Sequence, residues 1–156
     1  MGARVREYRP GDFEKLWAID QACFDPQVAY PRAELKFYIA DPAAFTLVAE
    51  HSTGEPIGFV VAQQQGRATG HIITIDVLEE ARGSGLGSKL LLAAEARLKE
   101  LGCRTVLLET AADNVAALAF YKKHEYFLVK TIPRYYASGV DAFLLKKDLL
   151  SAGWDG

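Results

Sequence analysis

The stretch His71–Glu95, HIITIDVLEEARGSGLGSKLLLAAE, decides the fold of this chain. It begins as an apolar strand, continues as a glycine-rich turn, and ends with the apolar spacing of an amphipathic helix. Glycines at positions 83, 85 and 87 lack Cβ atoms, so backbone N–H groups can converge at the positive end of the helix dipole. The stretch therefore predicts an anion-binding turn, most simply for a phosphate.

Two common phosphate-binding patterns fit this turn poorly. A P-loop requires G-x-x-x-x-G-K-[ST], but Lys89 is followed by Leu90. The dinucleotide pattern G-x-G-x-x-G nearly fits from Gly83, with Glu109 as the ribose-binding acid. However, several strand-like segments precede the turn, whereas that pattern closes the first strand of a βαβ alternation. Dinucleotide binding is therefore a distant alternative.

A third spacing, Arg82-x-x-Gly85-x-Gly87, fits without change. It resembles the [QR]-x-x-G-x-[GA] signature of the GCN5-related N-acetyltransferases (GNAT), which holds the pyrophosphate of acetyl-coenzyme A (acetyl-CoA).

Composition narrows the class of protein. With 156 residues and 50% hydrophobic content, we expect one domain over residues 1–150 and a frayed tail over 151–156. The net charge of −2 does not favour nucleic acid or a membrane surface as partner. No apolar run approaches the roughly 20 residues of a membrane span, and the N-terminus lacks a signal-peptide pattern. Two cysteines suit a reducing compartment, so we expect a cytoplasmic protein that is a monomer or a weak homodimer, without a metal site.

Periodicity and turn residues predict the elements in order. Expected strands cover residues 3–8, 44–50, 56–65, a segment entered after Arg67, 104–110, 126–131 and 140–147. Expected helices cover 10–23, 32–40, 85–101 and 114–124. This order predicts an α/β fold of the mixed α+β type, with a mostly antiparallel sheet and helices on both faces.

The second half of the chain strengthens the resemblance. Residues 107–127, LLETAADNVAALAFYKKHEYF, resemble the L-E-V-x-x-x-N-x-x-A-x-x-x-Y-x-x-x-G-F run of the RimI-like GNAT branch, which acetylates protein N-termini. Residues 134–142, RYYASGVDA, are similar to a "YY…G-x-D-A" stretch of archaeal and bacterial N-α-acetyltransferases. The resemblance covers roughly residues 70–147 and implies the GNAT fold, splayed at the cofactor strand. Glu125 stands where the family has glycine, so we expect the helix before it to end differently.

Acetyl transfer to an amine requires a base, an oxyanion donor and a proton for the leaving thiolate. Glu109 is a carboxylate on an otherwise apolar strand. Composition alone favours a glutamate at the strand end that faces solvent. The resemblance implies instead that Glu109 is the general base. His71 opens the preceding strand, and its imidazole and Glu109 are expected to share a water. That His71 is a histidine at a strand edge with no catalytic role is an alternative of equal weight.

The helix over 114–124 carries two further candidates. Tyr121 lies two helical turns after Asn114, so both side chains share one face. The resemblance implies that Tyr121 protonates the thiolate, whereas a tyrosine half-buried in the core is the alternative. Asn114 is predicted to cap the helix, and the resemblance adds a contact to the pantetheine arm.

The resemblance also places the two substrates. It implies pantetheine on the backbone of Ile75, Asp76 and Val77, with a β-bulge near 75–78. Around the pyrophosphate it implies Arg82, Gly83, Ser84, Gly85, Leu86, Gly87 and Ser88. For the acceptor it implies an aromatic groove of Tyr30, Tyr135 and Tyr136 beside Glu109, and first-residue selection by Phe24, Pro26 and Val28, for which a hydrophobic lid on the core is the alternative.

The sequence therefore predicts an acetyl-CoA-dependent N-acetyltransferase acting on the N-terminal amine of a protein or peptide, a ribosomal protein among the candidates. We expect direct transfer in a ternary complex, because neither cysteine lies in a motif. The alternatives are acetylation of a small amine on the same fold and a non-catalytic acetyl-CoA sensor.

Overall fold

A seven-stranded sheet organises the computed structural model, which describes residues 3–149. The strands are β1 (Arg4–Glu7), β2 (Ala44–Glu50), β3 (Pro56–Gln65), β4 (Thr69–Val77), β5 (Thr105–Ala111), β6 (Phe127–Ile132) and β7 (Ala142–Asp148), in the order β1-β2-β3-β4-β5-β7-β6. All neighbours are antiparallel except β4 and β5, which are parallel. The mixed, mostly antiparallel sheet predicted from the sequence is confirmed.

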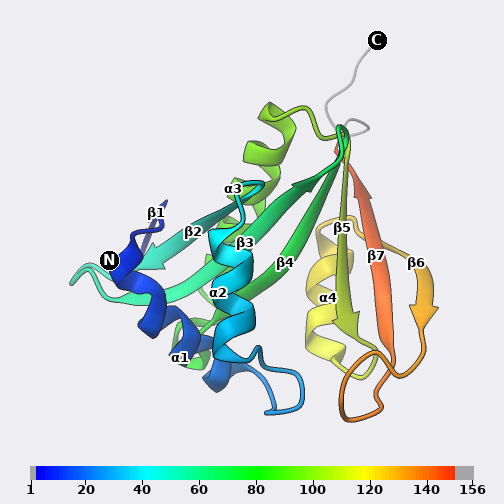
Figure 1. Cartoon of the computed structure of the whole chain (residues 1–156), viewed down its shortest axis with the longest axis horizontal. Helices are drawn as coiled ribbons and strands as arrows, with labels where there is room; N and C mark the ends of the chain where they lie inside the picture. The colour runs from blue at the N-terminus through cyan, green and yellow to red at the C-terminus, as the bar shows by residue number, and fades with distance from the viewer. Residues whose placement is uncertain (1–2, 150–156) are drawn as a thin grey trace.

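Helices cover both faces of the sheet, as predicted (Figure 1). They are α1 (Phe13–Cys23), α2 (Arg32–Ala40), α3 (Leu86–Glu100) and α4 (Val115–Lys123), with short 3₁₀ turns η1 (Pro10–Asp12) and η2 (Glu79–Ala81). On one face, α1 and α2 bury side chains such as Leu16 and Leu35 against β2 and β3. On the other, α3 and α4 share a core that includes Leu90 and Tyr121.

The two central strands separate after a short contact. β4 and β5 pair only at Thr69–Thr105, Gly70–Val106 and His71–Leu107, although both strands continue (Figure 1). Two residues after the last β4–β5 pair, the register between β3 and β4 shifts, so that Ile73 is an extra residue on β4. Such a bulge bends a strand and interrupts its ladder. The bulge predicted near 75–78 therefore lies earlier, at Ile73, and β4 turns away from β5 immediately after His71.

The end of α4 contradicts one prediction. Glu125 adopts φ 73°, the left-handed conformation that a glycine would take at this position. Its N–H donates to Lys122 O at 2.9 Å, and Tyr126 N–H donates to Tyr121 O at 3.0 Å, which completes a Schellman motif. The helix therefore ends as a glycine-terminated helix does, and our expectation of a different ending is wrong.

The other predicted elements match the structure to within about two residues at each end. The predicted tail at 151–156 lies outside the described residues, and the single domain over 1–150 stays a prediction. None of the helices within residues 3–149 is both long and apolar enough to cross a membrane.

Candidate active site

His71 and Glu109 meet where β4 and β5 separate. His71 is the last residue of the β4–β5 pairing, and Glu109 follows two positions after its partner Leu107. His71 Nε2 lies 2.7 Å from Glu109 Oε1, and each side chain keeps about a fifth of its surface exposed. The structure thus joins the two side chains directly at an accessible position, and a water shared between them stays a prediction.

A chain of hydrogen bonds behind His71 determines which ring nitrogen carries the proton. The Asp41 carboxylate only accepts, so Gln63 Nε2 donates to it at 2.5 Å, and Gln63 Oε1 then accepts from Gln65 Nε2 at 2.8 Å. The same Gln65 amide nitrogen lies 2.9 Å from His71 Nδ1. Since an amide nitrogen only donates, Nδ1 accepts. A neutral His71 therefore carries its proton on Nε2 and donates it to Glu109.

Sequence reasoning missed these glutamines. Gln63 and Gln65 alternate along β3 and share one face of it, opposite His71 and Thr69 on β4. The period-2 spacing of Gln63 and Gln65 indicates that their side chains share one face of the strand. The run QQQ, however, looks like the polar end of any strand, so its composition did not point to the site.

Four tyrosines lie in two packed pairs, and three of them are near Glu109. Tyr30 and Tyr38 pack edge to face with ring centroids 5.7 Å apart, and Tyr135 and Tyr136 do so at 4.9 Å. Burial raises the pKa of Tyr38, of Tyr135 and, to about 12, of Tyr136, and the nearby Glu109 charge adds to each shift. Tyr135 and Tyr136 thus lie near the carboxylate, with Tyr38 of α2 as a neighbour that the sequence did not reveal, and the aromatic groove itself stays a prediction.

Tyr30 is fixed by contacts with both of its neighbours, α1 and β4. Its N–H donates to Asp20 Oδ2 at 2.7 Å, and its carbonyl accepts from Trp17 Nε1 at 3.2 Å and Gln21 Nε2 at 2.9 Å. Its hydroxyl donates to Ile73 O at 3.2 Å, at the bulge of β4. The tyrosine is therefore anchored through three groups, and a groove wall built on it is rigid.

The rest of the loop between α1 and α2 carries the predicted selector residues. Phe24 and Val28 are half-buried and Pro26 is exposed. The N–H groups of Val28 and Ala29 both donate to Asp25 O at 2.8 Å, which closes a compact turn. The loop thus presents apolar side chains next to Tyr30, and first-residue selection by them stays a prediction.

Tyr121 is buried on α4, 8% exposed, between aromatic neighbours. Its ring packs edge to face against Phe120 at 5.2 Å and Tyr126 at 5.7 Å. Burial, followed by the charge of Asp76, raises the pKa of the Tyr121 phenol. The phenol therefore keeps its proton at neutral pH, which is the state a proton donor requires.

The glycine turn between β4 and α3 has the geometry of an anion cradle. Gly83 and Gly85 adopt φ 81° and 83°, where a side chain would be strained, and open space lies where each Cβ would stand. Arg82 Nε donates to Val77 O at 2.8 Å, which ties the turn to β4. The first N–H groups of the following α3 helix have no carbonyl within the helix to bind. They are available to an anion at this end of the helix dipole.

Two side-chain hydroxyls of the turn are already engaged. Ser84 Oγ donates to Ala81 O at 2.7 Å, and Ser88 Oγ lies 2.7 Å from His124 Nε2. These residues would therefore meet a phosphate mainly through their backbone.

Asn114 caps α4 as predicted, with Oδ1 accepting from Ala117 N–H at 3.1 Å. Its contact to pantetheine, like those of the backbone at 75–77, stays a prediction.

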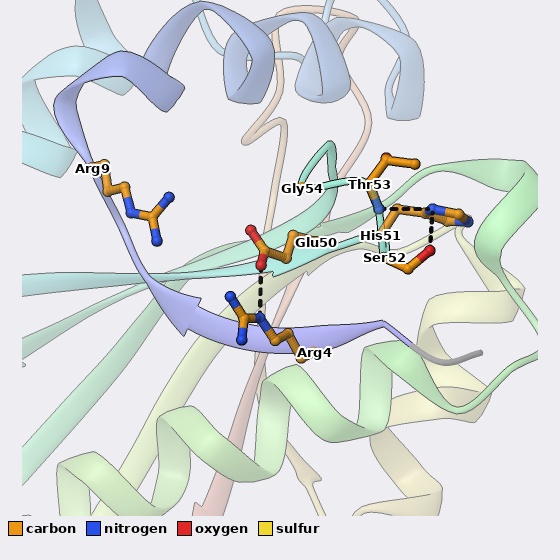
Figure 2. A pocket seen from close by; sticks show the side chains of 7 residues that line it. All are labelled: Arg4, Arg9, Glu50, His51, Ser52, Thr53 and Gly54. Carbon is orange, nitrogen blue, oxygen red and sulfur yellow. Dashed lines mark hydrogen bonds and ion pairs between the residues drawn. The ribbon is translucent and has the colours of Figure 1, made fainter.

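A separate open hollow lies between β1 and the β2–β3 turn (Figure 2). It is lined by Arg4, Arg9, Glu50, His51, Ser52, Thr53 and Gly54. Arg4 Nε binds Glu50 Oε2 at 2.7 Å there, and Arg6 Nε binds the other oxygen at 2.5 Å. Both Glu50 oxygens are thus used to hold β1 on β2, and the hollow has no part in the chemistry around Glu109.

Comparison with known proteins agrees with this geometry. Residues 13–126 match the profile described as the acetyltransferase (GNAT) family. N-alpha-acetyltransferase 30 of Schizosaccharomyces pombe is 32% identical over 118 residues, which are 73% of this chain and 78% of that protein. Ard1 from Thermoplasma volcanium, a solved structure, superposes with a TM-score of 0.86 at 26% identity, covering 95% of this chain and 98% of that one.

One relative is much longer than this chain. The mycothiol acetyltransferase of Pseudarthrobacter chlorophenolicus is 35% identical over 135 residues. The match covers 78% of this chain but 42% of that protein, so the chain corresponds to less than half of it.

Proposed function

The chain belongs to the acetyltransferase (GNAT) family, and from this premise we propose that it transfers acetyl from acetyl-CoA to the N-terminal α-amine of a protein or peptide. Acetyl transfer is the activity of the family. The choice of an α-amine as acceptor is supported by the relatives named N-alpha-acetyltransferase and by the aromatic rings near Glu109.

The observation that supports the proposed acceptor most strongly is the position of Glu109. Its carboxylate receives a hydrogen bond from His71 and stands at the opening between β4 and β5, among Tyr38, Tyr135 and Tyr136. Aromatic rings gathered around a carboxylate suit an extended peptide whose terminal ammonium arrives first, because the ammonium is attracted to the carboxylate and the rings can line the peptide backbone.

Each step of the proposed acetyl transfer is assigned to particular residues of the chain. When bound, acetyl-CoA supplies the acetyl group as a thioester. The N–H groups of the turn at 83–88 would hold its pyrophosphate, and the backbone of β4 beyond the bulge would hold its pantetheine. Glu109 takes a proton from the α-ammonium, so that the neutral amine can form the new C–N bond. As the C–S bond breaks, the Tyr121 phenol gives its proton to the departing sulfur, and the second proton that the amine nitrogen loses restores the phenol through solvent.

The state of the cysteines supports direct transfer in a ternary complex. Cys23 Sγ donates to Val77 O at 3.4 Å, and burial raises the pKa of this thiol to about 11. Burial also raises the pKa of Cys103. Because the thiolate is the nucleophile, two thiols held protonated are poor carriers of an acetyl group.

A small amine as acceptor is the second candidate, favoured by the relative named mycothiol acetyltransferase. An acetyl-CoA sensor requires neither Glu109 nor Tyr121, so their joint presence argues against it. A ribosomal acceptor, a cytoplasmic location and a monomeric or weakly dimeric state stay predictions.

The proposal is tested with acetyl-CoA and a panel of peptides that share one sequence, contain an internal lysine and differ in their first two residues. Tandem mass spectrometry then locates the acetyl group. We expect acetylation of the α-amine with a preference for a small or apolar first residue. Acetylation of lysine alone, or of a small amine with no peptide product, would reject the proposal.

A further inference from the structure

Two carboxyl groups are buried on the contacting elements α1 and β4, and the proposed mechanism uses neither of these side chains. Asp20 on α1 is fully buried, and Asp76 on β4 is 1% exposed. The helix α1 packs on β4, and the Asp20 carboxyl is close enough to raise the pKa of Asp76. Asp20 lies one helical turn after the buried Leu16, and Asp76 pairs with the buried Phe59 across the β3–β4 ladder, so an isolated charge is costly here.

The hydrogen bonds of this pair leave one oxygen of each group unsatisfied. Asp20 Oδ2 accepts from Tyr30 N–H, and Asp76 Oδ1 accepts from Thr74 Oγ1 at 2.6 Å. Asp20 Oδ1 and Asp76 Oδ2 are buried without a donor. A single proton between these two oxygens would satisfy both and remove one buried charge.

The other charged and titratable groups around the pair do not replace that proton. Arg82, beyond η2, favours the charged form of Asp76 only weakly, and its Nε is engaged by Val77 O. Cys23 on α1 and Tyr121 on α4 are held protonated and act on Asp76 only through their electrostatics. Burial, and then the Asp20 carboxyl, raise the pKa of Asp76 well above its usual range.

The pair connects the two substrate sites. Asp20 holds the backbone of Tyr30, the last groove residue of the loop after α1. Asp76 lies between Ile75 and Val77, whose backbone is expected to meet the pantetheine. On the basis of the proposed function, we propose that Asp20 and Asp76 share one proton and act as positioning residues that hold the acceptor loop, residues 24–31, against the cofactor strand β4.

The pH dependence follows from the direction of the shift. A carboxyl whose pKa is raised by folding contributes stability that is present at low pH and is lost as the pH rises through the raised value. Loss of the shared proton places two negative charges together and separates α1 from β4. We therefore expect the KM for peptide to rise about fivefold or more in alkaline solution, a typical size for coupling between sites, with kcat much less affected.

Asp76→Asn and Asp20→Asn provide the matched test, because an amide N–H replaces the shared proton and cannot be titrated. Asp20→Asn should keep the low-pH KM and lose its alkaline rise, and Asp76→Asn should likewise lose the alkaline rise relative to its own KM at low pH. Glu100→Gln, which removes an exposed carboxylate at the end of α3, is the control and should follow the wild type. An alkaline rise that persists in both asparagine variants overturns the positioning role.

The shared proton has its own readout, independent of acetyl transfer. In the free protein, the ¹³Cγ resonance of Asp76 should show a carboxyl that keeps its proton above the usual aspartate range. Loss of that proton within the usual range contradicts the shared proton. If no peptide is acetylated at all, the proposed function fails, whereas the carbon titration still decides the state of the pair.

Discussion

The 2.7 Å contact between His71 Nε2 and Glu109 Oε1 joins β4 to β5 at the last point where these strands pair. The hydrogen-bond chain from Asp41 through Gln63 and Gln65 leaves the imidazole proton on Nε2. His71 therefore orients and stabilises the carboxylate in the free protein, and Glu109 is left as the group that receives the proton of the amine.

Glu109→Gln should lower kcat by about 100-fold or more, the usual contribution of a general base, because the amide cannot take a proton. The Kd for acetyl-CoA should stay within about twofold, because the predicted cofactor contacts come from β4 and the glycine turn. Steady-state rates and cofactor titration measure the two effects. Glu55→Gln, in the β2–β3 turn, removes an exposed carboxylate and should retain full activity. An unchanged pH–rate profile in the Glu109 variant would exclude it as the base.

Gln65→Glu should change the protonation of His71, because a carboxylate at this position accepts a proton from Nδ1 and stabilises the imidazolium. We expect ¹⁵N NMR to show the Nε2–H tautomer in the wild type and an additional Nδ1–H in the variant. Gln64→Glu is the control, since Gln64 instead donates to Arg67 O and Leu101 O. A wild-type ring protonated on Nδ1 would contradict the inferred hydrogen-bond chain.

Tyr121→Phe should lower kcat by about 100-fold while the protein stays folded, because the ring packing is kept and the proton donor is lost. Tyr126→Phe is the matched control on the same aromatic cluster. Tyr126 Oη donates to Glu95 Oε2 at 2.8 Å in a buried position, so this variant should lose about 1–3 kcal/mol of stability and keep its kcat. Equal rates in the two variants would remove Tyr121 as the acid.

Glu125→Gly should raise the free energy of unfolding by about 1 kcal/mol, because φ 73° costs a residue with a side chain more than it costs glycine. Glu125→Ala retains that cost and should stay within about 0.5 kcal/mol of the wild type. Urea denaturation compares the three proteins. A destabilised glycine variant would mean that the Glu125 side chain makes a contribution larger than the backbone strain.

The sequence was informative where local signals set the structure. Glycine, proline and capping residues delimit nearly every element, as with Asn114 at the start of α4. The bulge was misplaced because register between β3 and β4 is determined by packing across the sheet. The end of α4 was mispredicted because the backbone motif around it outweighs the cost of a left-handed Glu125.

The candidate site was only partly predictable for a similar reason. Glu109, His71 and Tyr121 were found through motif spacing, whereas the roles of Gln65 and Tyr38 depend on the pairing of β3 with β4 and on the packing of Tyr38 against Tyr30. Asp20 did carry a signal: it is in phase with Phe13 and Leu16 on the apolar face of α1, where an unpaired carboxylate is unexpected. Its partner Asp76 becomes evident only when the helix packs on β4.

The most direct test of the central claim compares two peptides of identical sequence, one with a free α-amine and one with that amine blocked, each containing an internal lysine. Coenzyme A release is measured with acetyl-CoA in excess. We predict release with the free peptide, none above background with the blocked peptide, and an acetyl group on the α-nitrogen. Equal release from both peptides would show that the α-amine is not the acceptor and would contradict the account.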